Sequence, residues 1–388
     1  MMKVLYDYQA FQMQNVGGVS NCFAELIAHL PSAVEWQIGL KESDNVHLKE
    51  KRLIPNLPPN SLSANNFLMR KHFWGKGTTF KFLNDHLKCF PSSEHKNRRY
   101  SIELLEAQDF DVFHPTFFDP YFLPFIGNKP FVLTLHDFIT DRFRGSQDWQ
   151  TKCRMELAQK AAHFIAVSET TKRDAMEYLH VPEDKISVIY HGVSISDNLH
   201  LKAVVDGDYF LFVGRRNGYK NFLPMVEAIT PFLKSNPSYK LVCTANEFDK
   251  NELAAFSQLG VSRQIQHVFA SYEELLSLYK YAKAFIYPSL YEGFGIPILE
   301  AYAMKCPVFL SKESCFPEIA GDAALYFKLN DNENTLSALL TQFENMNQID
   351  YDFLIEKQNE RLKRYSWKQS AMQLAEVYRK VMHENAVL

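Results

Sequence analysis

The stretch SLYEGFGIPILEAYAMKCPV, residues 289–308, says most about the fold and the site of this chain. It follows an apolar run that predicts a strand, and it places Glu292 and Gly295 in the loop after that strand. Pro297 then opens a predicted helix that contains Glu300. Glycines just before a helix let its first amides face a ligand, so this junction is expected to bind an anion or hydroxyl groups.

Outward from this junction, short β-branched or aromatic runs alternate with amphipathic stretches, which is typical of βαβ units around a parallel sheet. Two series of strands are predicted, at 3–8, 35–40, 111–115, 131–136, 163–168 and 186–190, and at 209–213, 239–245, 265–270, 284–288, 308–311 and 325–327. The polar, turn-rich segment 194–208 separates the two series. We therefore predict two doubly wound α/β domains, residues 1–197 and 198–365, with a helix at 366–388 that closes back on the first.

The bulk composition excludes several classes of protein. With 388 residues, two domains of ordinary size are expected. A net charge of −3 argues against nucleic acid as a partner. The six cysteines show no metal-ligand spacing and are expected to be reduced. The sequence shows no signal-peptide pattern and no apolar run long enough to span a membrane, so we expect a cytoplasmic protein.

A basic and aromatic segment stands apart from this balanced background. Residues 70–99 contain eight Lys or Arg against two acidic residues, interleaved with aromatic side chains. One interpretation is a surface, taken as residues 67–99, that meets a membrane face or a lipid-linked acceptor, which would make the protein peripheral at the inner membrane. The other is a solvated helical face with its own core residues. The sequence leaves both open.

The spacing of the two glutamates in residues 289–308 is not informative by itself. The pattern Glu-x7-Glu occurs four times, at Glu42/Glu50, Glu169/Glu177, Glu292/Glu300 and Glu376/Glu384. Among these pairs, Glu292/Glu300 alone sits on a predicted strand, glycine loop and helix. Its context, and not its spacing, indicates a binding site.

A second cluster, FVGRRNGYKN at residues 212–221, places two arginines and Lys220 between a predicted strand and the next helix. Fixed cations stabilise the charge that develops on a departing phosphate. Arg215 and Lys220 suit that task, whereas Arg216 is as readily interpreted as a solvated side chain.

With these two clusters, the chain resembles the retaining family 4 glycosyltransferases, which have the GT-B fold. The resemblance is specific over residues 209–327 and looser over the N-terminal half. It implies that Glu292 contacts the donor sugar and that Glu300 holds the nucleotide ribose. It also implies that Arg215 and Lys220 bind the diphosphate, and that amides of the donor loop touch the sugar hydroxyls or the diphosphate; these are Phe294, Gly295 and Ile296.

The N-terminal half carries two further candidate positions. The pair Gly17 and Gly18 follows the first predicted strand, and a glycine pair allows a ligand to approach the backbone closely. The family has such a loop facing the diphosphate and the acceptor, although Asn21 stands where it often has arginine. His136 ends the strand FVLTLH, and the resemblance implies a histidine close to the donor sugar. Asp137 is equally well explained as a helix cap.

The resemblance implies transfer of a hexosyl group from a nucleotide-diphosphate sugar to a glycan or lipid-linked acceptor in polysaccharide biosynthesis. The strand ends HPT and LHD resemble mannosyl- and rhamnosyl-type members, which favours GDP-mannose over a UDP-sugar. No Asp-x-Asp pair lies in a loop suited to Mg²⁺, so no metal and no cofactor are expected. A sugar-nucleotide 2-epimerase of the same fold, and a module that binds nucleotide sugars without turnover, remain as alternatives.

Overall fold

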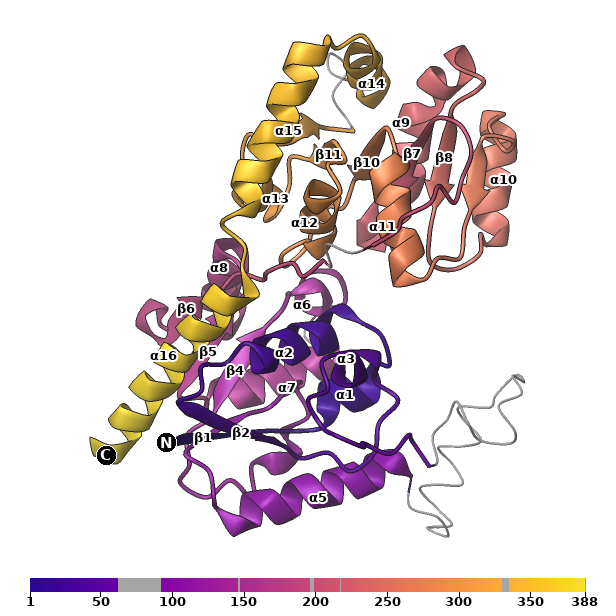
Figure 1. Cartoon of the computed structure of the whole chain (residues 1–388). Coiled ribbons are helices and arrows are strands. Elements are labelled where there is room, and N and C mark those ends of the chain that lie inside the picture. The colour runs from indigo at the N-terminus through magenta and orange to yellow at the C-terminus, as the bar shows by residue number, and fades with distance from the viewer. Residues whose placement is uncertain (62–91, 146, 196–198, 217, 330–334, 388) are drawn as a thin grey trace. The chain divides into compact units, whose positions relative to one another are not determined.

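The structure is a computed structural model that describes residues 1–61, 92–145, 147–195, 199–216, 218–329 and 335–387. The described chain divides into two compact units (Figure 1). The first unit contains residues 1–167, 171–189 and 367–388, and the second contains residues 168–170 and 190–366. Most of the basic and aromatic segment 67–99 lies outside the described residues.

Each unit is built on parallel strands, and all twelve predicted strands are confirmed, most of them shorter than predicted. In the first unit the order β2-β1-β3 is joined by a parallel bridge from Phe113 to Phe131 to the order β4-β5-β6. The second unit has one six-stranded sheet in the order β12-β11-β10-β7-β8-β9. The strands are β1 Met2–Tyr6, β2 Val34–Ile38, β3 Val112–His114, β4 Val132–Leu135, β5 His163–Ala166, β6 Ile186–Val188, β7 Tyr209–Phe212, β8 Lys240–Cys243, β9 Ile265–His267, β10 Ala284–Tyr287, β11 Val308–Ser311 and β12 Leu325–Phe327.

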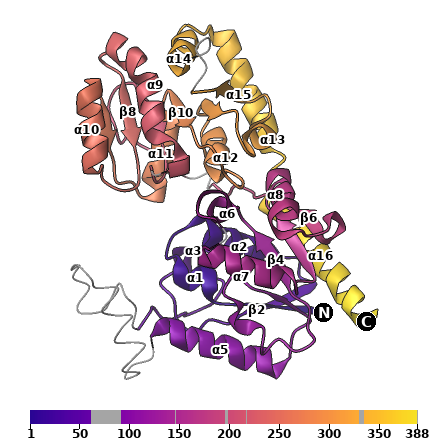
Figure 2. The ribbon, with the colours of Figure 1, turned by 180° about the vertical axis from the view of Figure 1, so that it is seen from behind.

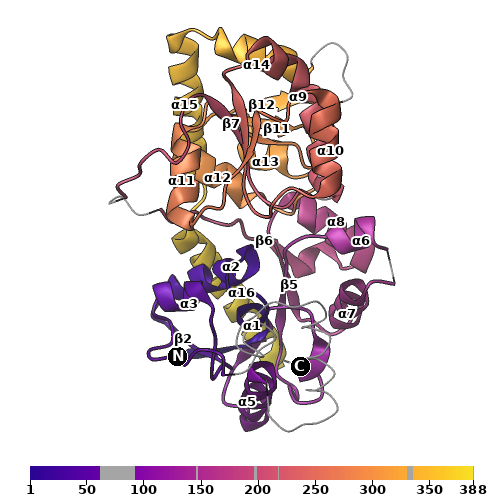
Figure 3. The ribbon, with the colours of Figure 1, turned by 90° about the vertical axis from the view of Figure 1, so that its right-hand side faces the viewer.

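The second unit places its sheet between two helical layers. Helices α9, α10 and α14 lie on one face, and α11, α12 and α15 lie on the other (Figure 3). Because both faces are covered, every residue of β7, β10 and β11 is buried, which explains their unbroken apolar runs. The helices of this unit are α9 Phe222–Ser235, α10 Lys250–Leu259, α11 Tyr272–Tyr281, α12 Ile296–Ala303, α13 Phe316–Ala320, α14 Leu336–Glu344 and α15 Gln348–Leu362.

The first unit includes the C-terminal helix of the chain. Helix α16 packs against α2 and β3. Helix α3 packs against α2, and these two helices lie side by side in Figure 2. The predicted closing helix is therefore confirmed as part of the first unit. The helices here are α1 Gln9–Met13, α2 Gly18–Ala28, α3 Val46–Glu50, α5 Ser93–Ala107, α6 Ile139–Phe143, α7 Trp149–Ala158, α8 Glu169–Leu179 and α16 Trp367–Val387.

A buried chain of hydrogen bonds ties α16 to the first sheet. The hydroxyl of Tyr378 lies 2.7 Å from the hydroxyl of Tyr6 and 2.6 Å from Nδ1 of His114. The other ring nitrogen of His114 lies 2.8 Å from Oγ1 of Thr134. Burial lowers the pKa of His114 to about 3, so its ring is neutral at pH 7. The histidine of the HPT strand end thus serves the fold of this unit.

Candidate functional site

The glycine loop of the second unit has the predicted form. Strand β10 ends at Tyr287, and α12 begins at Ile296 directly after Gly295. Gly295 has φ 94°, a left-handed conformation that favours glycine. A Cβ atom there would also lie 3.2 Å from Cδ1 of Ile298 and 3.3 Å from a ring carbon of Phe316. Glycine is therefore required both for the turn and for the space it leaves.

Glu292 lies in this loop as one half of an ion pair. Its Oε1 is 2.6 Å from Nζ of Lys220, and the two side chains are 11% and 14% exposed. The hydroxyl of Ser314 holds the Glu292 backbone on both sides, since it accepts from the amide at 3.2 Å and donates to the carbonyl at 2.7 Å. The structure thus brings two predicted residues, 72 positions apart in sequence, into direct contact.

Glu300 lies within α12 in a different environment. The hydroxyl of Tyr279 donates to its Oε2 at 3.3 Å, and burial of the carboxyl raises its pKa to about 7. Part of the residue is nevertheless exposed. In the described part of the chain no ion pair joins Glu300 to a cation. This carboxyl is poised to change charge near neutral pH.

The side chain of Phe294 belongs to the core of the second unit. It is 4% exposed, and its ring centroid lies 4.8 Å from that of His191 and 5.7 Å from that of Tyr365. The thiol of Cys315 donates to the Phe294 carbonyl at 3.1 Å. A ligand contact at this position is therefore left to the backbone amide, as it is at Gly295 and Ile296.

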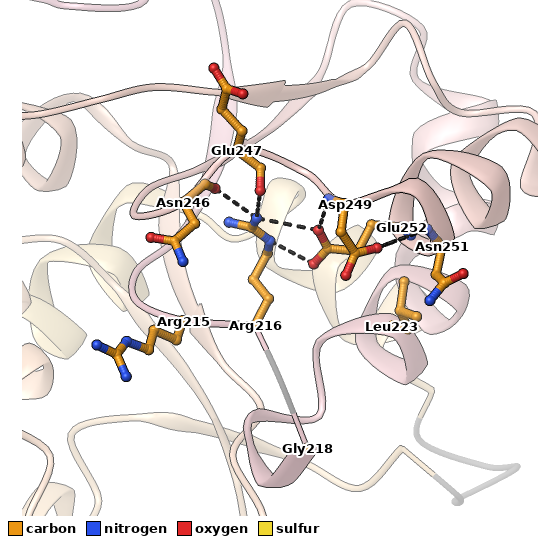
Figure 4. A pocket seen from close by; sticks show the side chains of 9 residues that line it. All are labelled: Arg215, Arg216, Gly218, Leu223, Asn246, Glu247, Asp249, Asn251 and Glu252. Atoms are coloured by element: carbon orange, nitrogen blue, oxygen red, sulfur yellow. Dashed lines mark hydrogen bonds and ion pairs between the residues drawn. The ribbon is translucent and has the colours of Figure 1, made fainter. Parts of the chain in front are cut away.

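The two neighbouring arginines of the second cluster behave differently. Arg215 is exposed, and among the described residues it has no hydrogen-bond or ion-pair partner. It lines a cavity of about 390 Å³ and points away from Arg216 (Figure 4). The other lining residues are Arg216, Gly218, Leu223, Asn246, Glu247, Asp249, Asn251 and Glu252. Arg215 is thus a cation available to a ligand.

Arg216 is not solvated, and the interpretation of it as a surface side chain was wrong. Its Nε lies 2.7 Å from Oε1 of Glu252, and its guanidinium donates to the carbonyls of Asn246 and Glu247, each at 2.7 Å (Figure 4). The side chain is 5% exposed, and its charge lies 4.7 Å from the ring centroid of Phe248. Arg216 therefore holds the loop after β8, and single-sequence reasoning could not foresee its partner.

The glycine pair of the first unit stands at the start of α2. A Cβ atom on Gly17 would lie 2.3 Å from Oε1 of Gln14, whereas one on Gly18 would meet open space. That Gln14 oxygen accepts from the amide of Ser20 at 3.1 Å and so caps the helix. Packing against Gln14 therefore explains why residue 17 is a glycine. At Gly18 the absence of a side chain leaves open space beside the first turn of α2.

His136 directly follows β4, and its ring centroid lies 5.8 Å from that of Phe23. Burial lowers its pKa to about 4, so the ring is neutral at pH 7 and can donate from one nitrogen. Asp137 accepts from the amide of Ile139 at 3.0 Å, which is the capping role considered for it. The carbonyl of Asp137 also accepts from buried Arg154 at 2.7 Å.

Sequence reasoning missed three side chains that contact the predicted site residues. Tyr287 stands beside Lys220, Tyr279 beside Glu300, and Ser314 clamps the backbone of Glu292. Tyr287 immediately precedes the proline before residues 289–308, so its place at the strand end was a usable signal. The other two come from separate elements and left no sign in the sequence.

No described helix is both long and apolar enough to cross a lipid bilayer.

Two family models match the chain, one for each half. Residues 16–197 match the model described as Glycosyltransferase Family 4, and residues 200–369 match the model described as Glycosyl transferases group 1.

Several curated proteins are similar over part of the chain. The O-antigen chain mannosyltransferase RfbU of Salmonella typhimurium is 30% identical over 56% of this chain and 61% of its own length. The GDP-mannose:cellobiosyl-diphosphopolyprenol alpha-mannosyltransferase of Xanthomonas oryzae pv. oryzae is 26% identical over 63% of this chain and 66% of its own. The chain thus spans less than two thirds of these relatives.

Solved structures are similar over almost the whole chain. Anabaena HepE in complex with UDP and glucose has a TM-score of 0.72 at 14% identity and covers 98% of this chain and 100% of its own. Sucrose-phosphate synthase from Thermosynechococcus elongatus has a TM-score of 0.65 at 15% identity, covering 99% and 100%. At such low identity the likeness shows the fold, and it confirms the predicted GT-B class of two α/β units.

Proposed function

The chain belongs to the glycosyltransferases of family 4 and group 1, and from this premise we propose that it is a retaining hexosyltransferase that uses a nucleotide-diphosphate sugar. The second unit binds the donor, and the first unit serves the acceptor. The acceptor is a hydroxyl group of a glycan or of a lipid-linked saccharide. Both matching family models describe glycosyltransferases, and the proposal assigns that activity to the whole protein.

The contact between Lys220 and Glu292 beside the glycine turn is the observation that carries the proposal. A cation, a carboxylate and a helix N-terminus together match a diphosphate joined to a sugar. The carboxylate accepts from sugar hydroxyls, and the ammonium neutralises charge on the departing phosphate. Arg215, which has no described partner, supplies a second cation for the diphosphate.

In the proposed reaction the acceptor hydroxyl attacks from the face that the nucleotide leaves, and the departing phosphate takes the proton. The transition state resembles an oxocarbenium ion, and no side chain acts as the nucleophile. The enzyme contributes positioning and electrostatic stabilisation. Lys220 and Arg215 supply the charge that a metal ion would otherwise bring, so the reaction proceeds without one. Neutral His136 donates a hydrogen bond to the sugar.

GDP-mannose is the donor that the relatives favour, since the Salmonella, Escherichia coli and Xanthomonas proteins are named as mannosyltransferases. A UDP-sugar is the second candidate, because HepE was solved with UDP-glucose. The relatives named for O-antigen chains support a role in polysaccharide biosynthesis, and we propose that the protein acts at the cytoplasmic face of a membrane. The segment 67–99 is the proposed membrane contact.

The direct test is transfer of labelled sugar from GDP-mannose or UDP-glucose to a lipid extract, with the anomeric configuration of the product read by NMR. Lys220→Met and Glu292→Ala should each lower turnover by about 100-fold or more, the usual effect of removing a preorganised electrostatic group. Glu376→Ala is the matched control, because Glu376 has the same spacing to a second glutamate but stands exposed on α16.

Turnover of Lys220→Met and Glu292→Ala within about threefold of wild type, under ~1 kcal/mol, would contradict the site. An inverted product would contradict the retaining course. Release of free nucleotide without any acceptor would indicate an epimerase, and tight binding without turnover would indicate a binding module. Activity abolished by EDTA and restored by Mg²⁺ would overturn the metal-free claim.

A further inference from the structure

Tyr287 is a buried tyrosine whose hydroxyl faces the charged pair of the proposed site. It is the last residue of β10 and is 3% exposed. Its ring packs against those of Phe285 and Phe316, with ring centroids 5.2 and 4.8 Å away. These contacts leave the ring little freedom, so the position of its hydroxyl is fixed by the sheet.

The Tyr287 hydroxyl lies beside the ion pair, on the side of the Lys220 ammonium. It accepts from Nζ of Lys220 over a long contact of 3.4 Å, while that nitrogen donates to Glu292 at 2.6 Å. Burial first, and then the charge of Glu292 and a hydrogen bond to its carboxylate, raise the pKa of Tyr287 well above its ordinary value. The phenol therefore stays neutral and has a proton to donate.

The Lys220 ammonium has three N–H donors, and the structure accounts for two of them. The rings of Tyr219 and Tyr287 flank the charge at 5.2 and 5.3 Å from Nζ. Within the described residues no third acceptor is hydrogen-bonded to Nζ. One donor is thus available to a ligand, and its direction is set by the other two contacts.

We propose that Tyr287 is a positioning residue that fixes the Lys220 ammonium and the Glu292 carboxylate in the geometry needed for sugar transfer. This inference rests on the proposed function of the same site. A lysine side chain has four rotatable bonds and a flexible stem, so the ion pair with Glu292 alone would leave the remaining N–H free to rotate. The phenol of Tyr287 removes that freedom before the donor binds. A fixed orientation of the ammonium contributes most to stabilising the transition state.

A second buried tyrosine offers a matched control. Tyr302 lies on α12 with an exposed fraction of 0%, and its hydroxyl donates to the carbonyl of Ala323 at 3.0 Å. Its hydroxyl bonds backbone carbonyls of the same unit, and among the described residues it makes no hydrogen bond to the ion pair. Tyr287→Phe and Tyr302→Phe each delete one buried hydroxyl, so they share any general cost to stability.

The test compares steady-state kinetics of the full chain carrying either substitution, with the donor that the wild-type protein uses. Tyr287→Phe should lower kcat about tenfold, because misplaced groups lose transition-state stabilisation, while the donor KM stays within about twofold. Tyr302→Phe should leave kcat within about twofold. Equal kcat for Tyr287→Phe and wild type, or an equal loss in both variants, overturns the inference.

A second measurement does not depend on turnover. Competitive labelling with acetic anhydride, followed by mass spectrometry, reports how accessible and how nucleophilic each lysine amine is, and both fall when the amine is held in hydrogen bonds. Labelling at Lys220 should be faster in Tyr287→Phe than in wild type and unchanged in Tyr302→Phe. Unchanged labelling in Tyr287→Phe overturns the positioning role. If wild type transfers no sugar, the proposed function fails separately, and the labelling result still decides the role of Tyr287.

Discussion

The two glutamates of residues 289–308 share one motif but have different environments. Glu292 is neutralised by Lys220 at 2.6 Å, within a loop clamped by Ser314. Glu300, one turn into α12, is held by tyrosine hydroxyl groups, and burial raises its pKa to about 7. Burial among neutral partners makes the charge of Glu300 sensitive to pH near neutrality. The two glutamates of this motif therefore have different roles, which their positions in the sequence do not reveal.

The largest expected effect is on turnover, and it should differ between the two glutamates. Glu292→Gln should lower turnover about 100-fold, because it removes the carboxylate at the sugar and leaves Lys220 without its partner. Glu300→Gln should lower it by no more than about tenfold, because the amide still accepts hydrogen bonds. Steady-state kinetics of the two isosteric variants decide the matter. Equal losses would mean that the two carboxyl groups share one task.

The next effect concerns the stability of the paired carboxylate. Removing either member of a mostly buried pair strands the other charge, so Lys220→Met and Glu292→Gln should each destabilise the protein. The double variant should be more stable than the sum of the two losses by about 2 kcal/mol, as measured by urea unfolding. The pair of Lys357 and Asp322, whose aspartate is 81% exposed, is the control and should give a much smaller coupling. Additive losses at the first pair would contradict the contact.

A third effect sharpens the comparison through pH. The carboxyl of Glu300 titrates near pH 7 in the folded protein and near pH 4.5 when unfolded, so between these values the folded state holds a proton that the unfolded state has lost. Its contribution to stability therefore falls as pH rises from 4.5 to 7. Glu300→Gln should raise Tm relative to wild type by about 3 °C at pH 8 and leave it unchanged at pH 4.5. Equal shifts at both pH values would contradict the raised pKa.

The smallest expected effect on stability is at Arg215. Because this side chain is exposed and has no described partner, Arg215→Met should change the free energy of unfolding by less than about 0.5 kcal/mol. The same change should weaken binding of GDP or UDP, more strongly at 20 mM than at about 300 mM salt, because salt screens exposed charges. Calorimetric titration at the two salt concentrations measures this. Unchanged nucleotide affinity at low salt would remove Arg215 from the site.

Much of the fold could be predicted from the sequence, because buried parallel strands leave unbroken apolar runs such as YFLF in β7 and AFIY in β10. The glycine turn was equally visible, since φ 94° at Gly295 demands that residue type. Contacts between side chains far apart in the sequence were harder to predict. The partner of Arg216 is a glutamate 36 residues away, and nothing in either local pattern links them.

The central claim, that Lys220 and Glu292 form a nucleotide-diphosphate-sugar site, is tested most directly by calorimetric titration of the full chain. The ligands are GDP-mannose, UDP-glucose and UDP-N-acetylglucosamine, each added to wild type and to Lys220→Met. The account predicts one-to-one binding of at least one of them to wild type, weakened at least about tenfold by the substitution, or ~1.4 kcal/mol. Binding of equal strength to both proteins would contradict it.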